Sequence, residues 1–386
     1  MITITPPTSK SIAHRAIICG CLSNGHCTIS NVTFSDDILA TINSLRAIGA
    51  DIKISNTDVI INKSSFHFGT LDCNESGSTL RFLLPIVATI GTGGEFIGKK
   101  SLMSRPIDTF LSLLTKSGVT IQKTEGKITI ENSLQSFKYY VCGDISSQYL
   151  TGLMLGLPLL NKECEINVTT TLFSKSYIDL TIMVLKSFGI SVQNENYKKF
   201  IIPKDSRYQS TNFTIETDYS AAAFFLVASK IDKKLNILGL NPHSKQGDKA
   251  IVDILNHNEP FCIDVSDIPD LVPIIAVYMC HLVGKSKITN AGRLRFKESD
   301  RLDTTVSELR SLGGNITLSN DSIIINGTGR LKGGVYNSHN DHRIAMAMAI
   351  ASLICDSKVT CIGKDCVNKS YPNFWEDFNK LGKEIL

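Results

Sequence analysis

One short phrase recurs along the chain and constrains the fold more than any other feature. It consists of an apolar residue, three further residues, a glycine and then an alternating, strand-like run. Five copies carry the glycine, at Gly49, Gly118, Gly189, Gly313 and Gly382, and a weaker copy at residues 255–259 lacks it. Successive copies lie about 70 residues apart, with one shorter interval. The sequence therefore predicts six units of one design.

Each repeated glycine stands where a helix ends and a residue with a left-handed backbone is needed. A pair of short strands is expected after it, for example residues 51–55 and 58–62, or 315–318 and 322–326. Helices alternating with short strands indicate an α/β (α+β) protein. The repeat by itself is structural and assigns no function.

The ends of the chain suggest how the six units divide. The last copy leaves almost no chain for a following strand, whereas the chain begins with an isolated strand pattern at residues 2–5. We therefore expect the amino-terminal strand to complete the carboxyl-terminal part. This predicts two domains of three units each, residues 1–8 plus 215–386 and residues 9–214.

Composition supports folded domains and excludes several classes of protein. The 386 residues are 42% hydrophobic and 20% charged, with a mean hydropathy of +0.06, which suits two packed cores and not a disordered chain. The longest apolar stretch, residues 271–283, is shorter than the ~20 residues that span a membrane. We expect no membrane segment and no secretory signal at the amino terminus.

Charge and cysteine content give two further expectations. The net charge is only +4, and the lysines and arginines are spread among acidic residues. The sequence therefore gives little reason to expect nucleic acid as a partner. Eleven cysteines occur singly without a CxxC pair, which favours reduced thiols over disulfides or a zinc site. These patterns predict a cytoplasmic protein, and we expect no metal and no cofactor.

Four polar segments precede apolar helical runs in the first half of the chain, at residues 8–15, 75–81, 146–149 and 174–177. Hydroxyl side chains, glycine and cations at a helix start suit an anion such as phosphate or carboxylate. In the first segment Ser11 and Arg15 lie four residues apart and share a helix face, while His14 is expected to be a surface or packing residue. Ordinary capped helices are the alternative for each segment.

Three further segments carry charged groups in the second half. Lys297 and Arg301 lie four residues apart and can hold one anion, and Glu298 between them is a candidate general acid or base. The segment 340–343 opens a small-residue helix and brings a histidine and an arginine to its first turn. Asp270, between two prolines, is rigidly placed and is a candidate base. Surface ion pairs and helix caps are the alternatives.

Taken in order along the chain, these motifs resemble the EPSP synthase (3-phosphoshikimate 1-carboxyvinyltransferase) family over essentially its whole length. The resemblance rests on the following motifs: Ser9-Lys10-Ser11 with Arg15, Ser76-Gly77-Ser78-Thr79 with Arg81, Arg105-Pro106, Ser146-Ser147-Gln148, Ile268-Pro269-Asp270, Lys297-Glu298 with Asp300-Arg301, Asn340-Asp341-His342-Arg343 and Lys369 to Pro372.

The resemblance implies two inverse α/β domains, each of three βαβαββ repeat units, with the active site in the cleft between them. It also implies a reaction: the enolpyruvyl group of phosphoenolpyruvate moves to the 5-hydroxyl of shikimate 3-phosphate, and phosphate leaves by addition and elimination. A monomer that acts on these two small molecules is expected. Because cations can hold the anionic groups, the reaction needs no metal.

The resemblance also implies roles for individual residues. Asp270 would accept the hydroxyl proton, and Glu298 with Lys10 would deliver and later remove the methyl proton. The residues expected to bind phosphoenolpyruvate are Lys10, Gly77, Arg105, Gln148, Arg301, Arg343 and Lys369. Those expected to bind shikimate 3-phosphate are Lys10, Ser11, Arg15, Ser146, Ser147, Gln148, Ser174, Asp270 and Lys297, with Tyr177 a weaker match.

Two positions depart from the family pattern. Many members have asparagine where this chain has Glu75, and a negative charge there would repel an anion unless it is paired, for which Arg81 is a candidate. Many also have asparagine where this chain has Arg293. We therefore do not transfer the family's role to Glu75, and the contact with shikimate 3-phosphate at Arg293 stays open.

Other functions remain open from the sequence. A UDP-N-acetylglucosamine enolpyruvyl transferase would share the repeat fold, but its characteristic cysteine is absent from the stretch at residues 98–105. A non-catalytic protein that binds anions could keep the scaffold. A nucleic-acid-processing relative is disfavoured because basic segments interleaved with aromatic residues are missing.

Overall fold

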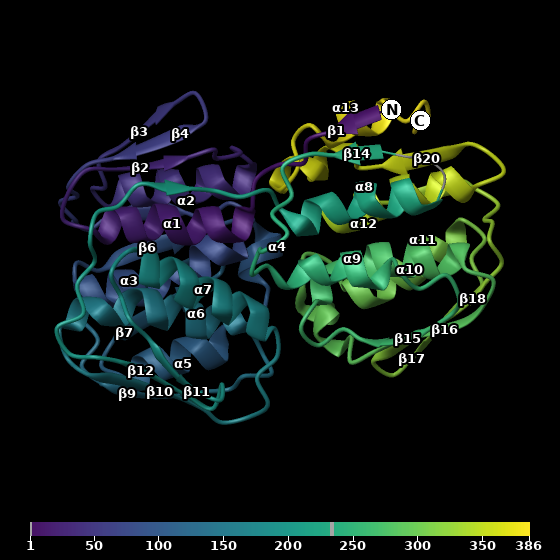
Figure 1. Cartoon of the computed structure of the whole chain (residues 1–386). Helices are drawn as coiled ribbons and strands as arrows, with labels where there is room; N and C mark the ends of the chain where they lie inside the picture. Colours follow the sequence, from purple (N-terminus) through teal and green to yellow (C-terminus); the bar gives the residue numbers. More distant parts are fainter. Residues whose placement is uncertain (1, 232–234) are drawn as a thin grey trace. The chain divides into compact units, whose positions relative to one another are not determined.

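The computed structural model describes residues 2–231 and 235–386. The chain divides into two compact units (Figure 1). Unit 1 comprises Met1–Pro7 and Thr217–Leu386, and unit 2 comprises Thr8–Glu216. The breaks lie within two residues of the boundaries expected from the repeat, at residues 8 and 214.

Unit 2 alternates helices with short strands throughout its length. Its elements are α1 (Lys10–Leu22), β2 (Cys27–Ser30), α2 (Asp36–Ala47), β3 (Ile52–Ser55), β4 (Asp58–Ile61), β5 (Thr70–Asp72), α3 (Gly77–Ile90), β6 (Gly94–Ile97), α4 (Lys100–Met103), α5 (Asp108–Lys116), β7 (Thr120–Thr124), β8 (Lys127–Glu131), β9 (Lys138–Val141), α6 (Ser147–Gly156), the 3-10 helix η1 (Leu157–Leu160), β10 (Cys164–Val168), α7 (Lys175–Ser187), β11 (Gln193–Glu195), β12 (Lys199–Ile202) and β13 (Phe213–Thr214).

Three four-stranded sheets of one pattern build unit 2. Their strand orders are β13-β2-β4-β3, β5-β6-β8-β7 and β9-β10-β12-β11. In each sheet the first two strands pair in parallel and the others pair antiparallel. The antiparallel hairpin is the strand pair expected after each repeated glycine, and β3 and β4 turn at Asn56, whose φ is 52°. The three expected repeat units are therefore present.

Unit 1 has the same alternation with more 3-10 helix. Its elements are β1 (Ile2–Ile4), α8 (Tyr219–Ile231), β14 (Leu235–Ile237), η2 (Gly247–Ala250), α9 (Ile251–Ile254), β15 (Cys262–Asp264), η3 (Pro269–Leu271), α10 (Val272–His281), β16 (Gly284–Thr289), η4 (Gly292–Phe296), α11 (Arg301–Ser311), β17 (Ile316–Ser319), β18 (Ser322–Gly327), β19 (Gly334–Asn337), α12 (His342–Ala351), η5 (Ser352–Ile354), β20 (Val359–Ile362), η6 (Lys364–Lys369) and α13 (Phe374–Asn379).

The sheets of unit 1 explain the irregular copies of the repeat. One sheet, β15-β16-β18-β17, has the full pattern, whereas the described residues form only pairs in β1-β14 and β19-β20. The copy without glycine, residues 255–259, follows α9 and leads to β15 without a hairpin. As expected, the amino-terminal strand joins this unit, because β1 pairs in parallel with β14.

Helices form the interior of each unit, with the sheets outside them (Figure 1). Every residue of α12 is buried, as are nine of the ten residues of α10. This is why α10, and α12 after His342 and Arg343, are apolar on all sides rather than on one stripe. The five repeated glycines all have positive φ, from 70° at Gly382 to 101° at Gly118. The predicted left-handed helix ends are therefore confirmed.

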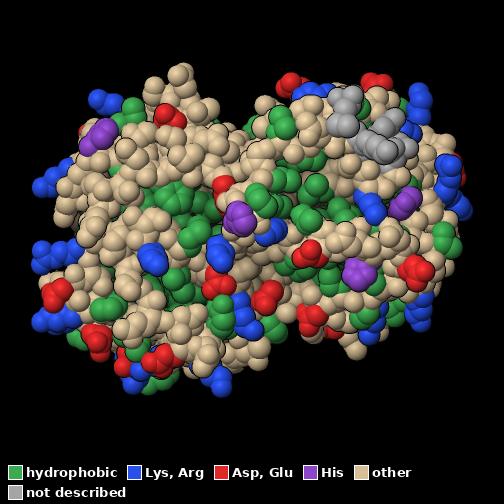
Figure 2. Space-filling model, viewed as in Figure 1, with side chains coloured by type: hydrophobic (Ala, Val, Ile, Leu, Met, Phe, Trp, Pro, Cys, Tyr) green, Lys and Arg blue, Asp and Glu red, His purple; other side chains and the backbone are tan. Residues whose placement is uncertain are grey.

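Two properties of the chain as a whole concern its environment. Among residues 2–231 and 235–386, no helix is both long and apolar enough to cross a membrane. On the face shown in Figure 2, lysine and arginine side chains are interspersed with acidic ones and form no continuous stripe.

Candidate active site

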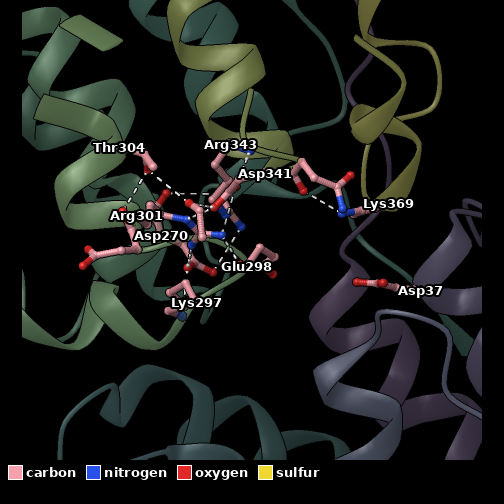
Figure 3. Close-up of polar contacts among 12 residues, drawn as sticks. Asp37, Asp270, Lys297, Glu298, Arg301, Thr304, Asp341, Arg343 and Lys369 are labelled. Carbon is pink, nitrogen blue, oxygen red and sulfur yellow. Dashed lines mark hydrogen bonds and ion pairs between the residues drawn. The ribbon is translucent and has the colours of Figure 1, made fainter. Parts of the chain in front are cut away.

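Arg301 is the centre of a buried ion-pair cluster in unit 1 (Figure 3). It is the first residue of α11, and only 1% of its side chain is exposed. Its NH1 donates to Asp270 Oδ1 at 2.9 Å, its Nε donates to Asp341 Oδ2 at 2.9 Å, and its NH2 donates to Glu298 Oε2. One guanidinium thus holds three carboxylates that lie far apart in the sequence.

Asp270, in η3, is surrounded by cations. Lys297 Nζ lies 3.2 Å from its Oδ1, and Arg343 NH2 donates to its Oδ2 at 3.1 Å. Burial by itself raises the pKa of Asp270, but Arg343, Lys297 and Arg301 outweigh this effect and hold the pKa well below its usual range. Burial also lowers the pKa of Lys297, partly offset by Asp270. In this state Asp270 is a firmly ionised carboxylate.

The segment 340–343 contributes to the same cluster from the start of α12. Asp341 is the helix cap and accepts from the backbone of Arg343 at 2.9 Å. Asn340 offers its backbone carbonyl to Lys369 Nζ at 2.6 Å (Figure 3). Arg301, Arg343 and Lys369, all expected to bind phosphoenolpyruvate, therefore belong to one hydrogen-bonded part of unit 1.

Asp248 is a further acidic group near this cluster that the sequence analysis did not single out. It lies in η2 and is 4% exposed. Burial and the negative charge of Asp270 raise its pKa to about 7, while Arg343 opposes the shift. Asp248 is therefore a buried carboxyl group whose protonated form is favoured more than in an exposed aspartate.

In unit 2, Lys10 is the first residue of α1 and forms an ion pair with α2. Its Nζ donates to Asp37 Oδ2 at 2.5 Å, and both side chains are largely buried. Asp37 lies in the first turn of α2, where helix amides favour a negative charge. The pair holds the ammonium of Lys10 at the start of two helices.

Arg15 is more enclosed than expected of a residue that meets a ligand. Its Nε donates to Thr181 Oγ1 at 2.8 Å, and its NH2 donates to Thr151 Oγ1 at 3.4 Å and to the carbonyl of Tyr177 at 3.2 Å. NH1 donates to the Ser11 carbonyl at 2.6 Å. Burial lowers the pKa of Arg15 to about 10. Arg15 therefore joins α1, α6 and α7 in addition to any contact with substrate.

Two arginines converge on Gly77 at the start of α3. A Cβ atom at Gly77 would lie 2.5 Å from Arg81 NH1 and 3.3 Å from Arg105 NH1. Arg81 NH1 also donates to Gln148 Oε1 at 2.9 Å, and Gln148 Nε2 donates to Ser78 Oγ at 3.0 Å. Gly77, Gln148 and Arg105, all expected to bind phosphoenolpyruvate, thus lie together. Arg81, which was not expected to bind it, lies among them.

The expected serines stand at helix starts. Ser146 caps α6 and accepts from the backbone of Gln148, and Ser147 is the first residue of that helix. Ser174 precedes α7 with a φ of 56° and is buried. The four predicted polar helix starts are thus confirmed as helix starts, at α1, α3, α6 and α7.

His14 is a packing residue and not a surface residue. It is 1% exposed, and its Nδ1 lies 2.7 Å from Thr41 Oγ1. Thr41 in turn lies 2.6 Å from Thr79 Oγ1, and Thr79 donates to Ser76 Oγ at 2.7 Å. This buried chain of hydroxyl groups links α1 to the residue that caps α3.

The sequence and fold both match known proteins. A family model for EPSP synthase (3-phosphoshikimate 1-carboxyvinyltransferase) matches residues 2–260 and 255–378. The chain belongs to the EPSP synthase family. It is 42% identical to the 3-phosphoshikimate 1-carboxyvinyltransferase of Clostridium perfringens, over 97% of this chain and 95% of the relative. It is 41% identical to that of Clostridioides difficile, over 98% and 94%.

Solved structures give the same fold. An EPSP synthase structure from Acinetobacter baumannii matches with a TM-score of 0.80 and 25% identity, over 98% of this chain and 95% of that one. The enolpyruvyl transferase NikO from Streptomyces tendae matches with a TM-score of 0.79 at 15% identity, over 100% and 95%, and shares the fold. The expected family, fold class and activity, transfer of the enolpyruvyl group to shikimate 3-phosphate, are confirmed.

Several residues around these EPSP synthase motifs were missed from the sequence. Asp37, the ion-pair partner of Lys10, and Asp248, near Asp270 and Arg343, were not singled out. Arg81 was named as a motif residue and as a candidate partner of Glu75, but not as a neighbour of Gly77 and Gln148. Asp341 was named within the motif at residues 340–343, but its ion pair with Arg301, 40 residues away, was not predicted. Asp37 lies 27 residues from Lys10, and no local pattern connects them.

Proposed function

We propose that this EPSP synthase family member transfers the enolpyruvyl group with Asp270 and Glu298 as its proton-transfer residues. The observation that supports this most is that Arg301 binds both carboxylates, through NH1 and NH2 of one guanidinium. The reaction needs a base for the attacking hydroxyl and an acid for the methylene carbon in a single event. A shared arginine would keep these two groups at a defined separation.

Asp270 is the proposed base for the 5-hydroxyl of shikimate 3-phosphate. Three cations lower its pKa in the ligand-free state, which makes it a weak base. The substrates carry phosphate and carboxylate groups that compete for the same cations. Their binding would draw Arg343 and Lys297 away from Asp270 and so raise its pKa, making the base stronger when substrate is present.

Glu298, together with Lys10, is proposed to deliver a proton to the methylene carbon and later remove one. Glu298 is partly exposed and bound to Arg301, so its carboxyl group can reach a ligand. Lys10 is held by Asp37 and keeps its ammonium at the helix start. The departing phosphate would be stabilised by positive groups that are already in place.

The remaining assignments follow the family motifs. Phosphoenolpyruvate is proposed to contact Lys10, Gly77, Arg105, Gln148, Arg301, Arg343 and Lys369. Shikimate 3-phosphate is proposed to contact Lys10, Ser11, Arg15, Ser146, Ser147, Gln148, Ser174, Asp270 and Lys297.

The two compact units are proposed to be the two functional domains, in a monomer that works on small-molecule substrates without metal. We also propose a cytoplasmic location. All eleven cysteines are free thiols and most are buried, which fits a reducing compartment.

The test is phosphate release by purified, chelator-treated protein with phosphoenolpyruvate and either shikimate 3-phosphate or UDP-N-acetylglucosamine. We expect phosphate release when shikimate 3-phosphate is the acceptor and none with UDP-N-acetylglucosamine. Asp270→Ala and Glu298→Ala should each reduce this release at least about a hundredfold. Asp356→Asn, at an exposed ion pair with Arg330, is the control and should keep full activity.

Two other results would contradict the proposal. Release with the nucleotide sugar would assign the other enolpyruvyl transfer reaction. Binding of both ligands without any release would indicate a non-catalytic protein that binds anions.

A further inference from the structure

We propose that Glu75 is a positioning residue that holds Arg105 over Gly77 through Ser101. The inference rests on the proposed role of Gly77 and Arg105 in binding phosphoenolpyruvate. Glu75 departs from the asparagine of many family members, and its charge beside an anion site needs an explanation. It is 8% exposed and accepts a hydrogen bond from Ser101 Oγ at 2.9 Å.

Glu75 belongs to the first of two loops, residues 73–75 and 97–101, which are joined by successive hydrogen bonds. The backbone of Cys73 donates to the Ile97 carbonyl at 2.8 Å, and the backbone of Lys99 donates to the Asn74 carbonyl at 2.8 Å. The next contact in the same direction is the bond from Ser101 to Glu75. Residues 73, 74 and 75 thus contact residues 97, 99 and 101 in the same order along both segments.

The last contact differs from the first two because it depends on a side chain. The first two bonds join backbone groups and would survive most substitutions. Beyond residue 99 the second loop becomes α4, a single helical turn of Lys100–Met103, which is too short to be stable by itself. The buried side chain of Leu102 packs this turn against the core, and the carboxylate of Glu75 supplies its hydrogen-bonded tertiary contact.

The turn leads directly to Arg105. The backbone of Arg105 donates to the Leu102 carbonyl at 3.1 Å, so the arginine is attached to the end of the turn. Its NH1 lies 3.3 Å from where a Cβ of Gly77 would be, and its buried Nε has no hydrogen-bond partner among the described residues. Arg105 thus relies on its backbone for placement. That backbone is held after Arg105 by the bond from Tyr149 OH to the Pro106 carbonyl at 2.9 Å, and before it by the contact of Ser101 with Glu75.

The charges around Gly77 remain favourable for an anion. Arg81 and Arg105 bring two positive groups to this point, and Glu75 brings one negative group. Oε1 of the Glu75 carboxylate accepts from Ser101, so Glu75 can act through α4 without contacting the ligand.

The test compares Glu75→Ala, Ser101→Ala, their double variant and Glu75→Gln in steady-state kinetics. Both alanine variants should raise the KM for phosphoenolpyruvate about tenfold, with much smaller changes in the KM for shikimate 3-phosphate. The double variant should have a KM no higher than that of either single variant, because both substitutions remove the same hydrogen bond. Glu75→Gln keeps an oxygen acceptor for Ser101 and should restore a KM near that of the parent.

Ser104→Ala is the matched control, since its exposed hydroxyl makes only a 3.5 Å contact to the carbonyl of Ser101. A readout independent of activity is amide hydrogen exchange in residues 99–105, which should speed up in the two alanine variants but not in Glu75→Gln or Ser104→Ala.

Three results would overturn the proposal. If Ser101→Ala leaves the KM for phosphoenolpyruvate unchanged while Glu75→Ala raises it, Glu75 acts directly and not through Ser101. A Glu75→Gln as impaired as Glu75→Ala would make its charge decisive. Unchanged exchange in residues 99–105 would disprove the anchoring of α4, whatever the activity. If the parent protein itself releases no phosphate, the proposed function fails, while the exchange result still decides the role of Glu75.

Discussion

Arg301 and Asp341 form a two-point ion pair that is almost completely buried. Nε and NH2 of the guanidinium lie 2.9 and 3.2 Å from the two carboxylate oxygens, and the side chains are 1% and 0% exposed. Asp341 also accepts from the backbone of Arg343 at the start of α12. One carboxylate therefore fixes the orientation of Arg301 and begins the helix that carries Arg343.

Asp341→Asn should be strongly destabilising. Removing one partner of a buried ion pair leaves a charge without full compensation and typically costs about 3–5 kcal/mol. The free energy of unfolding from urea titration measures this. Asp356→Asn, at an ion pair whose side chains are 61% and 73% exposed, should change stability by less than about 1 kcal/mol. Equal losses in the two variants would contradict the buried role of Asp341.

Asp270 should contribute stability that disappears in acid. Because its pKa is lower in the folded protein than in the unfolded chain, the contribution is complete above about pH 4 and is lost as pH falls toward the folded pKa. The difference in unfolding free energy between the parent and Asp270→Asn should shrink by about 1 kcal/mol from pH 5 to pH 3. If the difference in unfolding free energy stays constant between pH 5 and pH 3, the pKa of Asp270 is not lowered in the folded protein.

His14 should make the protein less stable at mildly acidic pH. Burial, with Lys10 and Arg15 nearby, lowers the pKa of His14 well below its usual value, so the unfolded chain binds a proton that the folded protein does not. Stability should therefore fall as pH drops below about 6.5. Between pH 7 and pH 5 the parent should lose about 2 kcal/mol more than His14→Gln. Equal pH profiles by urea titration would contradict a neutral, buried His14.

Gly77→Ala should impair the site without unfolding unit 2. The added Cβ would displace Arg81 NH1, the flexible end of a long side chain, and disturb its bond to Gln148. We expect the KM for phosphoenolpyruvate to rise about tenfold, while the midpoint of thermal unfolding stays within a few degrees, since alanine is a good helix former. An unchanged KM would mean that the approach of the two arginines to Gly77 does not matter for binding.

Much of the fold could be predicted because it depends on short, local patterns. A glycine after a helix, followed by two alternating runs, specifies a helix end and a hairpin wherever it occurs. The missing glycine at residues 255–259 coincides with the missing hairpin before β15. The polar segments at Ser9, Ser76, Ser146 and Ser174 begin helices as expected. The hydroxyl groups of Ser76 and Ser146 accept from helix amides, whereas Ser9 and Ser174 make no side-chain cap bond.

The chemical types of the site residues were also available from the sequence, but their partners were not. Order and spacing of the motifs specified the family, and with it the set of acids, cations and serines. Arg301 and Asp341 lie 40 residues apart, Lys10 and Asp37 lie 27 apart, and Ser101 and Glu75 lie 26 apart. Such pairs form only when separate elements pack together. Burial then determines how much each pair contributes to the free energy of unfolding. The tertiary structure alone therefore decided that Asp270 has a low pKa, that His14 is enclosed and that Glu75 anchors α4.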